Sequence, residues 1–154
     1  MCFWETIFET LLLCPMGKIL ALDYGKKRTG LAETDPLQLI ATGLTTVATN
    51  TLFLFLENYF SKENISLVLV GEPKQKDGSP SEIESEIQQF LKQFKAQFPH
   101  IKLQRVDERY TSKIAAQTLL QSGAKKKKRQ DKALLDTISA TLILQTYLQA
   151  KPIL

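Results

Sequence analysis

The sequence predicts an α/β fold: a mixed sheet with an antiparallel three-strand meander followed by parallel strands, and helices on both faces. Three observations predict it. Strand-like runs follow one another in residues 18–48 with short turns between them. Beyond residue 50, strand-like runs alternate with longer runs of helical periodicity, the pattern of parallel strands joined by helical crossovers. The first run is apolar on both faces, which favours a strand covered on both sides.

The meander is expected to contain three short strands. Residues 18–24 form the first, the segment "GKKRTG" supplies a turn, and residues 28–34 return as the second. Residues 44–48, "LTTVA", are β-branched and make the third. Asn50 is a candidate N-cap for the first helix, because "TLFLFLENYFSKEN" carries apolar residues at helical spacing.

A buried strand at residues 65–71 is expected to open the parallel part of the sheet. The loop "EPKQKDGSPS" follows, and its proline and glycine residues break regular structure. Ser81 and Glu84 have the spacing of a capping box, which predicts the start of a long helix. The helix shows one apolar face, made by Ile83, Ile87, Phe90, Leu91, Phe94 and Phe98.

The last strand and two more helices complete the predicted fold. The segment "IKLQRVDE", residues 101–108, is a short strand, and Gly123 ends the helix that Thr111 or Ser112 caps. A basic loop, "AKKKKRQDK", then leads to a final helix from about Asp131 to Gln149.

Length and composition favour a single domain. The chain has 154 residues, 44% of them hydrophobic, which suits one core. Met16 stands directly before "GKILALDYG", so we expect the domain at residues 16–150 and an extension, or an over-long start assignment, at residues 1–15. That extension carries Glu5 and Glu9 and has no cation before its apolar run, so it does not match an export signal.

Charge and cysteine content narrow the possible partners. A net charge of +4, from 20 cations and 16 acids, permits a polyanionic partner but is only mildly basic. Cys2 and Cys14 offer neither a disulfide framework nor the spacing of metal ligands. No apolar stretch reaches the roughly 18 to 20 residues that a membrane span requires. We therefore expect a cytoplasmic protein that does not bind membranes.

Acidic residues occur at positions from which they can converge. Asp23 ends the first strand, Asp107 and Glu108 end the last one, and Asp136 lies within the final helix. If the first and last strands are close neighbours that point the same way, their terminal carboxylates become adjacent. Alternation lets only one of Asp107 and Glu108 face such a site, and periodicity alone does not select it.

The final helix has small residues next to its acid. Ser139 and Ala140 share a face with Asp136 and would let the helix approach the sheet closely. Three close carboxylates require bound protons or a cation, and oxygen ligands favour Mg²⁺ or Mn²⁺. With phosphate oxygens completing the shell, two such ions can activate water against a phosphodiester. The simpler interpretation of an acid at a strand end is the polar start of a loop.

Three motifs carry a resemblance to a known family. "LDYGKKRTGLAETDP", "DERYTS" and "LLDTISATLIL", in this order and at these separations, resemble the YqgF family, described as Holliday-junction resolvases or pre-16S rRNA nucleases. The resemblance extends over about Met16 to Leu148. It implies an RNase H-like fold and cleavage of nucleic acid with a divalent metal. It also implies that Asp23, Glu108 and Asp136 are the catalytic residues and the metal ligands.

The same resemblance extends to residues around these acids. Arg28 and Gly30 match the basic, glycine-containing first turn of the family, and Asp35 matches the acid after its second strand. One departure is visible, because the family usually has Gly-Leu-Pro where this chain has "GEP". Glu72 in that segment is therefore expected to alter the substrate approach or the metal environment.

Two basic segments flank the predicted acidic centre and are expected to contact phosphates without reading sequence. A solvated lysine loop is the alternative for the second segment, and an ion pair is the alternative for Arg109. The candidate substrate-binding residues are Lys26, Lys27, Arg28, Arg109, Lys125, Lys126, Lys127, Lys128 and Arg129.

These observations favour a metal-dependent endonuclease, a hydrolase that acts on structured nucleic acid. Processing of the 5′ end of pre-16S rRNA, a step of ribosome biogenesis, is the role that the resemblance favours. The alternatives are a Holliday-junction resolvase acting on branched DNA and a nucleic-acid-binding module without turnover. A phosphotransferase ranks last, because the sugar kinases and actin-like ATPases that "DYGKKRTG" also resembles generally use two domains. We expect a monomer or a weak homodimer.

Overall fold

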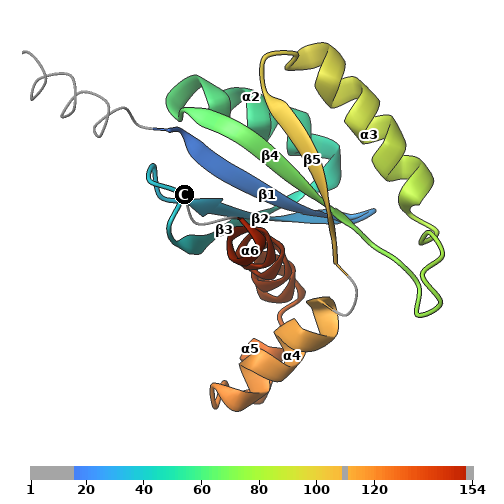
Figure 1. Ribbon diagram of the computed structural model, residues 1–154. Coiled ribbons are helices and arrows are strands. Elements are labelled where there is room, and N and C mark those ends of the chain that lie inside the picture. The colour runs from blue at the N-terminus through green and yellow to red at the C-terminus, as the bar shows by residue number, and fades with distance from the viewer. Residues whose placement is uncertain (1–15, 109–110, 152–154) are drawn as a thin grey trace, which may run out of the picture.

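The computed structural model describes residues 16–108 and 111–151 and shows a five-stranded mixed sheet between layers of helices (Figure 1). This confirms the predicted α/β class. The elements, in chain order, are β1 (Lys18–Tyr24), β2 (Arg28–Thr34), β3 (Ala41–Ala48), the 3₁₀ turn η1 (Thr49–Thr51), α2 (Leu52–Lys62), β4 (Ile65–Glu72), α3 (Glu84–Gln97), β5 (Lys102–Asp107), α4 (Thr111–Gln121), α5 (Lys126–Arg129) and α6 (Lys132–Ala150).

The strand order is β3-β2-β1-β4-β5. β1, β2 and β3 form the predicted antiparallel meander, whereas β4 pairs parallel to β1 and β5 pairs parallel to β4. The first and last strands point the same way, as expected, but they are not direct neighbours because β4 lies between them. β1, β4 and β5 therefore end at one edge of the sheet, where sites of α/β proteins gather.

Helices cover both faces of the sheet (Figure 1). α2 and α3 lie on one face, α6 lies on the other, and α4 packs against α6. Strand alternation assigns the residues of β1 to these faces: Leu20 and Leu22 belong to the core under α2 and α3, whereas Ile19 and Ala21 belong to the core under α6. Asp23 continues the alternation of Ile19 and Ala21 and therefore faces α6.

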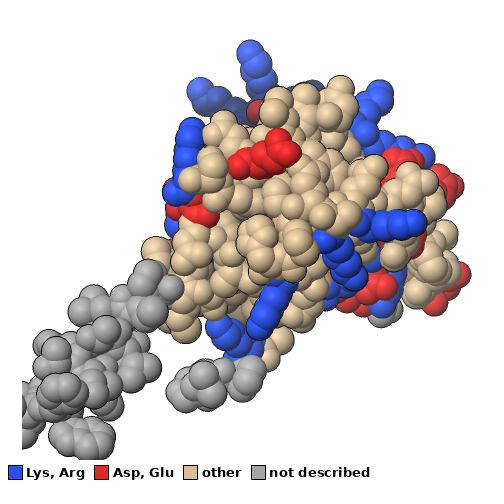
Figure 2. Space-filling view, turned by 90° about the horizontal axis from the view of Figure 1, so that it is seen from above, with Lys and Arg blue, Asp and Glu red and all other residues tan. Residues whose placement is uncertain are grey.

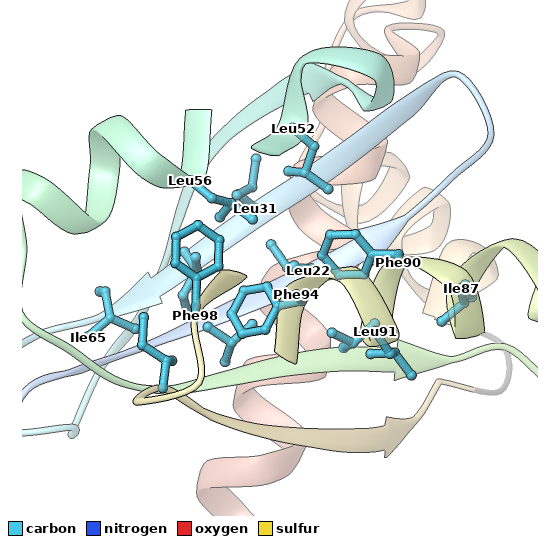
Figure 3. Close-up of a cluster of buried hydrophobic side chains, with 14 residues drawn as sticks. Leu22, Leu31, Leu52, Leu56, Ile65, Ile87, Phe90, Leu91, Phe94 and Phe98 are labelled. Carbon is cyan, nitrogen blue, oxygen red and sulfur yellow. The ribbon is translucent and has the colours of Figure 1, made fainter. Parts of the chain in front are cut away.

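The core under α2 and α3 consists of large side chains (Figure 3). Phe94 is fully buried, and its ring centroid lies 5.9 Å from that of Phe90 and 5.1 Å from that of Phe98. The apolar face predicted for this helix is confirmed. The buried members of this core are Leu20, Leu22, Leu31, Leu52, Leu56, Ile65, Val68, Val70, Ile87, Phe90, Leu91, Phe94, Phe98 and Ile101.

Two predicted helix caps are wrong. Asn50 lies inside the 3₁₀ turn, and the N-cap position of α2 is Thr51, which makes no side-chain cap hydrogen bond. The capping box is not formed either, because α3 begins only at Glu84 and has Ile83 at its N-cap position. The carboxylate of Glu84 binds Arg105 of β5 instead, at 2.9 Å from Nη1. The side chain of Glu84, which the local pattern assigned to helix capping, therefore makes a tertiary contact instead.

The last third of the chain follows the prediction with one exception. Gly123 ends α4 with φ of +71°, the left-handed conformation that glycine adopts without strain. Asp131 caps α6 and accepts hydrogen bonds from the backbone N–H groups of Ala133 and Leu134. The predicted basic loop is partly helical, because residues 126–129 form the short helix α5. Within the described ranges no helix is long and apolar enough to cross a membrane.

Candidate active site

The structure brings the three predicted acids to the carboxyl edge of the sheet, on the face covered by α6. Asp23 is the penultimate residue of β1, and Glu108 directly follows β5. Asp136 lies in the second turn of α6, close enough for its charge to raise the pKa of Asp23. Asp23 is thus the acid that interacts with both of the others.

The half-buried Asp23 and the buried Glu108 form a pair of carboxyl groups that share a side-chain hydrogen bond. Burial, which disfavours the charged form, and then the charge of Asp136 raise the pKa of Asp23 to about 6, although the hydrogen bond from Glu108 opposes this rise. Burial and the neighbouring Asp23 raise the pKa of Glu108 to about 9. In the absence of a cation the pair therefore retains a proton at neutral pH.

Gly71 makes this pairing sterically possible. It lies on β4, between the strands that carry Asp23 and Glu108, and pairs with Val106 of β5. A Cβ atom at this position would collide with the carboxyl group of Glu108 and would lie 2.9 Å from Cδ1 of Ile143. The absence of a side chain on the middle strand therefore leaves the space that Glu108 occupies.

Gly30 leaves the space that the backbone of α6 occupies. It is the antiparallel partner of Asp23 across β1 and β2, and a Cβ atom there would collide with the backbone carbonyl of Asp136. α6 thus rests directly on the sheet at the residue that carries the third acid. Ser139 and Ala140 are both buried, at 1% and 0% exposure, so the predicted close approach through small residues is observed.

Asp136 is held by a cation. Nε of Arg28, on β2, donates a hydrogen bond to Oδ2 of Asp136 at 2.9 Å, and the two side chains are 38% and 26% exposed. As the side chains lie, residues 16–108 and 111–151 contain no group of three acidic, histidine or cysteine side chains placed to hold one metal ion. The structure therefore shows a close carboxyl pair with the third acid next to it, paired with Arg28.

The structure places Glu108, and not Asp107, on the face of the sheet that α6 covers. Glu108 is 8% exposed and faces α6. Asp107 lies on the other face, where Lys74 is 3.5 Å from its Oδ2 and 3.6 Å from Oε2 of Glu72. Glu72 is the direct partner of Asp107 across β4 and β5. The unusual glutamate of the "GEP" segment thus belongs to an ion-pair cluster on the face opposite Glu108.

Arg105 supports the site from behind, a role that the sequence reasoning did not identify. Its Nη1 and Nη2 atoms bind the two carboxylate oxygens of Glu84 at 2.9 and 3.1 Å, and Nη2 also donates to the carbonyl of Gly71 at 3.1 Å. The positive charge of Arg105 lowers the pKa of Glu108 and so opposes part of the rise caused by burial. Its side chain ties α3 to the strand ends that carry the acids.

The other predicted substrate-binding residues lie at the surface. Nζ of Lys26 is 3.6 Å from Oε1 of Glu86, and Lys27 is exposed at the β1–β2 turn. Arg109 and the side chain of Arg129 lie outside the described residues. Figure 2 looks at the molecule from above the view of Figure 1 and shows acidic and basic side chains interspersed around a largely uncharged centre. The exposed lysines that precede α6 are Lys125, Lys126, Lys127 and Lys128.

Asp35 organises a loop instead of joining the acids. Its carboxylate accepts hydrogen bonds from the backbone N–H groups of Leu37, Leu39 and Ile40 at 3.0, 2.8 and 2.7 Å. These hydrogen bonds lower the pKa of Asp35 against the opposing effect of burial. Arg28 and Gly30, which were assigned to the first turn, both lie on β2.

The donor set fits a hard divalent cation such as Mg²⁺ or Mn²⁺. Asp23 and Glu108 offer carboxylate oxygens only, and they retain a shared proton because burial and the charges of neighbouring acids raise both pKa values. A bound divalent cation would take the place of that proton, and Asp136 offers a further carboxylate on the same face. The arrangement, two strand-end acids and a helix acid beside a mixed sheet of order 3-2-1-4-5, defines an RNase H-like protein.

Comparison with solved structures agrees with that class. The chain is similar in fold to the Fowlpox virus resolvase in its crystal structure with substrate Holliday junction DNA, with a TM-score of 0.51 and 15% sequence identity. The match covers 86% of this chain and 97% of the viral chain. A family model described as RuvX, Holliday junction resolvase, matches residues 17–150. The chain belongs to this RuvX (YqgF) family, which confirms the resemblance found in the sequence.

Curated relatives are similar over nearly their whole length. A protein of Christiangramia forsetii, named provisionally as a pre-16S rRNA nuclease, is 60% identical over 133 residues, which cover 86% of this chain and 98% of the relative. A relative with the same name from Flavobacterium psychrophilum is 56% identical over 136 residues, which cover 88% of this chain and 99% of the relative.

Proposed function

We propose that this protein is a divalent-metal-dependent endonuclease that hydrolyses phosphodiester bonds in structured nucleic acid. Asp23, Glu108 and Asp136 would be both the catalytic residues and the metal ligands, and Mg²⁺ or Mn²⁺ would be the cofactor. The observation that carries the proposal is the buried Asp23–Glu108 pair with Asp136 beside it at the carboxyl edge of the sheet. Family membership and the nuclease names of the relatives support the same activity.

The chemistry follows from the placement of these groups. When bound, a divalent ion would lower the pKa of a water nucleophile and stabilise charge on the leaving oxygen. Asp23 lies between the other two acids and would contribute most to holding the ion, while Glu108 would lose its proton as the ion binds. Arg28 and the lysines at the β1–β2 turn would bind phosphates of the strand.

The preferred substrate is the 5′ end of pre-16S rRNA, because the relatives that are similar over nearly their full length carry that name. Such a role places the protein in the cytoplasm, with pre-rRNA as its partner. Branched DNA is the second candidate substrate. The description of the family model and the viral resolvase complex favour it.

A cleavage assay on two matched substrates tests the proposal. Wild-type protein with Mg²⁺ or Mn²⁺ is expected to cut a pre-16S 5′-end RNA, and Asp23→Asn and Glu108→Gln are each expected to reduce the rate by at least about 10²-fold. Asp107→Asn is the matched control, because it removes an adjacent acid on the opposite face. A comparable loss of cleavage rate in Asp107→Asn would show that cleavage depends on the total negative charge near the strand ends and not on the position of Glu108.

The same assay separates the alternatives. Faster cutting of a four-way DNA junction than of the RNA would identify a resolvase. Binding of either substrate without cleavage under any divalent metal, equal for wild type and Asp136→Asn, would indicate a binding module and contradict the nuclease proposal.

A further inference from the structure

The side chain of Asp136 lies near one acid, Asp23, and one cation, Arg28. Its backbone rests on Gly30, whose strand partner is Asp23, and Arg28 lies two residues earlier on β2, on the same face of the sheet. Oδ2 of Asp136 is 2.9 Å from Nε of Arg28. The charge of Asp136 nevertheless raises the pKa of Asp23. Asp136 therefore lies between an acid that repels it and a cation that holds it.

The ion pair is open to competition from solvent and ligands. Arg28 keeps 38% of its side chain exposed, and only its Nε donates a hydrogen bond to Asp136. A pair of this kind is weak, because water screens it and a single hydrogen bond holds it. Phosphate oxygens can accept two parallel hydrogen bonds from a guanidinium group, whereas the Asp136 carboxylate accepts one here.

Arg28 also lies where a phosphate would arrive. It follows the exposed turn that carries Lys26 and Lys27, and it opens β2 at the edge of the sheet where Asp23 and Glu108 meet. A strand bound along this turn would bring a backbone phosphate within reach of the guanidinium group, beside the acids.

We propose that Arg28 is a positioning residue that holds Asp136 away from the metal site and releases it when its guanidinium group binds a substrate phosphate. This inference rests on the proposed nuclease function. Once released, Asp136 adds a third carboxylate beside Asp23, and the mutual repulsion of the acids then favours a divalent cation. The nucleic-acid strand and the metal ion therefore bind cooperatively, and each strengthens the binding of the other by the same factor.

Calorimetric titration with Mn²⁺ tests this coupling without an activity readout. In the absence of nucleic acid, Arg28→Gln is expected to bind Mn²⁺ about fivefold more tightly than wild type, the scale of an exposed ion pair. Lys74→Gln is the control, because it removes one positive charge from the face away from α6, outside the proposed phosphate-binding residues, and leaves the Asp136 contact intact. This control is expected to change the Mn²⁺ affinity less than about twofold.

A second titration includes a short RNA strand with cleavage-resistant phosphorothioate linkages. The strand is expected to increase Mn²⁺ affinity more in wild type than in Arg28→Gln, because the variant has no ion pair to release. In the titration without nucleic acid, equal or weaker Mn²⁺ binding by Arg28→Gln than by wild type would overturn the proposal. A gain in Mn²⁺ affinity in Lys74→Gln as large as that in Arg28→Gln would overturn it too. Failure of all variants to bind Mn²⁺, with or without the strand, would overturn the metal site as well. Cleavage by wild type tests the nuclease function independently.

Discussion

On the face covered by α2 and α3, the core is built mainly from phenylalanine, leucine and isoleucine side chains. The core under α6 has no buried aromatic ring among the described residues and combines alanines with Ile19, Leu69, Ile143 and Leu144. At the first interface the ring of Phe94 is fully buried, and the rings of Phe90 and Phe98 are also buried. At the second, Ala21 and Ala140 are fully buried, and a Cβ atom on Gly30 would collide with the helix backbone. The two faces thus differ in how far each helix stands from the sheet.

This difference separates stability from chemistry. Burial of large apolar side chains supplies most of the folding free energy, at about 25 cal/mol per Å² of apolar surface. The α6 face buries fewer large side chains, but it brings the short side chain of Asp136 next to Asp23. Changes on the first face are therefore expected to act on the unfolding free energy, and changes on the second to act on the site.

The largest expected effect is on the large-residue face. Phe94→Ala removes a fully buried ring and leaves a cavity, so the free energy of unfolding should fall by about 3–5 kcal/mol. The total free energy of unfolding of such domains is only about 5–15 kcal/mol. Urea denaturation measures the loss. Cleavage per folded molecule should stay near the wild-type value, and a selective loss of cleavage would show that this face also shapes the site.

The buried carboxyl pair should make stability depend on pH. In EDTA, Glu108 has a folded pKa of about 9 against an ordinary value of 4.5, so the folded state binds a proton more tightly than the unfolded state. Its contribution is fully present below pH 4.5 and is lost as the pH rises toward 9; Asp23, with a pKa raised to about 6, acts in the same direction. The free energy of unfolding should therefore fall by on the order of a few kcal/mol across this window.

Glu108→Gln provides the control for this pH dependence. Its neutral amide mimics the protonated acid, so denaturation curves at pH 5.5 and 8.5 should differ much less than those of wild type. Mn²⁺ should restore the stability of wild type at pH 8.5, because it replaces the proton between the acids. A wild-type stability that rises with pH in EDTA would contradict the shared proton.

The helix contact can be broken from the sheet side. Gly30→Ala forces α6 away from β2 at Asp136, so we expect a loss of about 1–3 kcal/mol in stability and at least about 10²-fold in cleavage rate. Gly123→Ala is the control. It places alanine at φ of +71° with no atom within 4 Å of the added Cβ, so it strains the backbone without touching the site. Cleavage by the folded control should be unchanged.

Much of this arrangement could be predicted from the sequence, because it depends on apolar periodicity. The strands that carry Asp23 and Glu108, and the helix that carries Asp136, were predicted within a few residues. The capping box at the start of α3 was not formed, because the carboxylate of Glu84 binds Arg105, which is 21 residues away in sequence. Local patterns carry no information on which distant partner a side chain will bind.

Within the site, the facing acid and the spacing between strands required the three-dimensional structure. Periodicity left Asp107 and Glu108 equivalent, and the resemblance, not the residues alone, selected Glu108. Gly71 gave no signal in the sequence beyond its place in "GEP". Its importance depends on β4 lying between β1 and β5, and a strand order of this kind is set by the packing of the whole sheet.

The smallest expected effect concerns the acids on the face away from α6. Lys74→Gln leaves Glu72 and Asp107 as like charges directly opposite each other on β4 and β5. Such cross-strand repulsion and the loss of a partly exposed ion pair should together cost about 0.5–1 kcal/mol. Urea denaturation at low and high salt should show this cost and its screening. Cleavage should change less than about twofold, because the cluster lies behind the strands that carry Asp23 and Glu108; a tenfold loss would mean that these acids act on the site through the sheet.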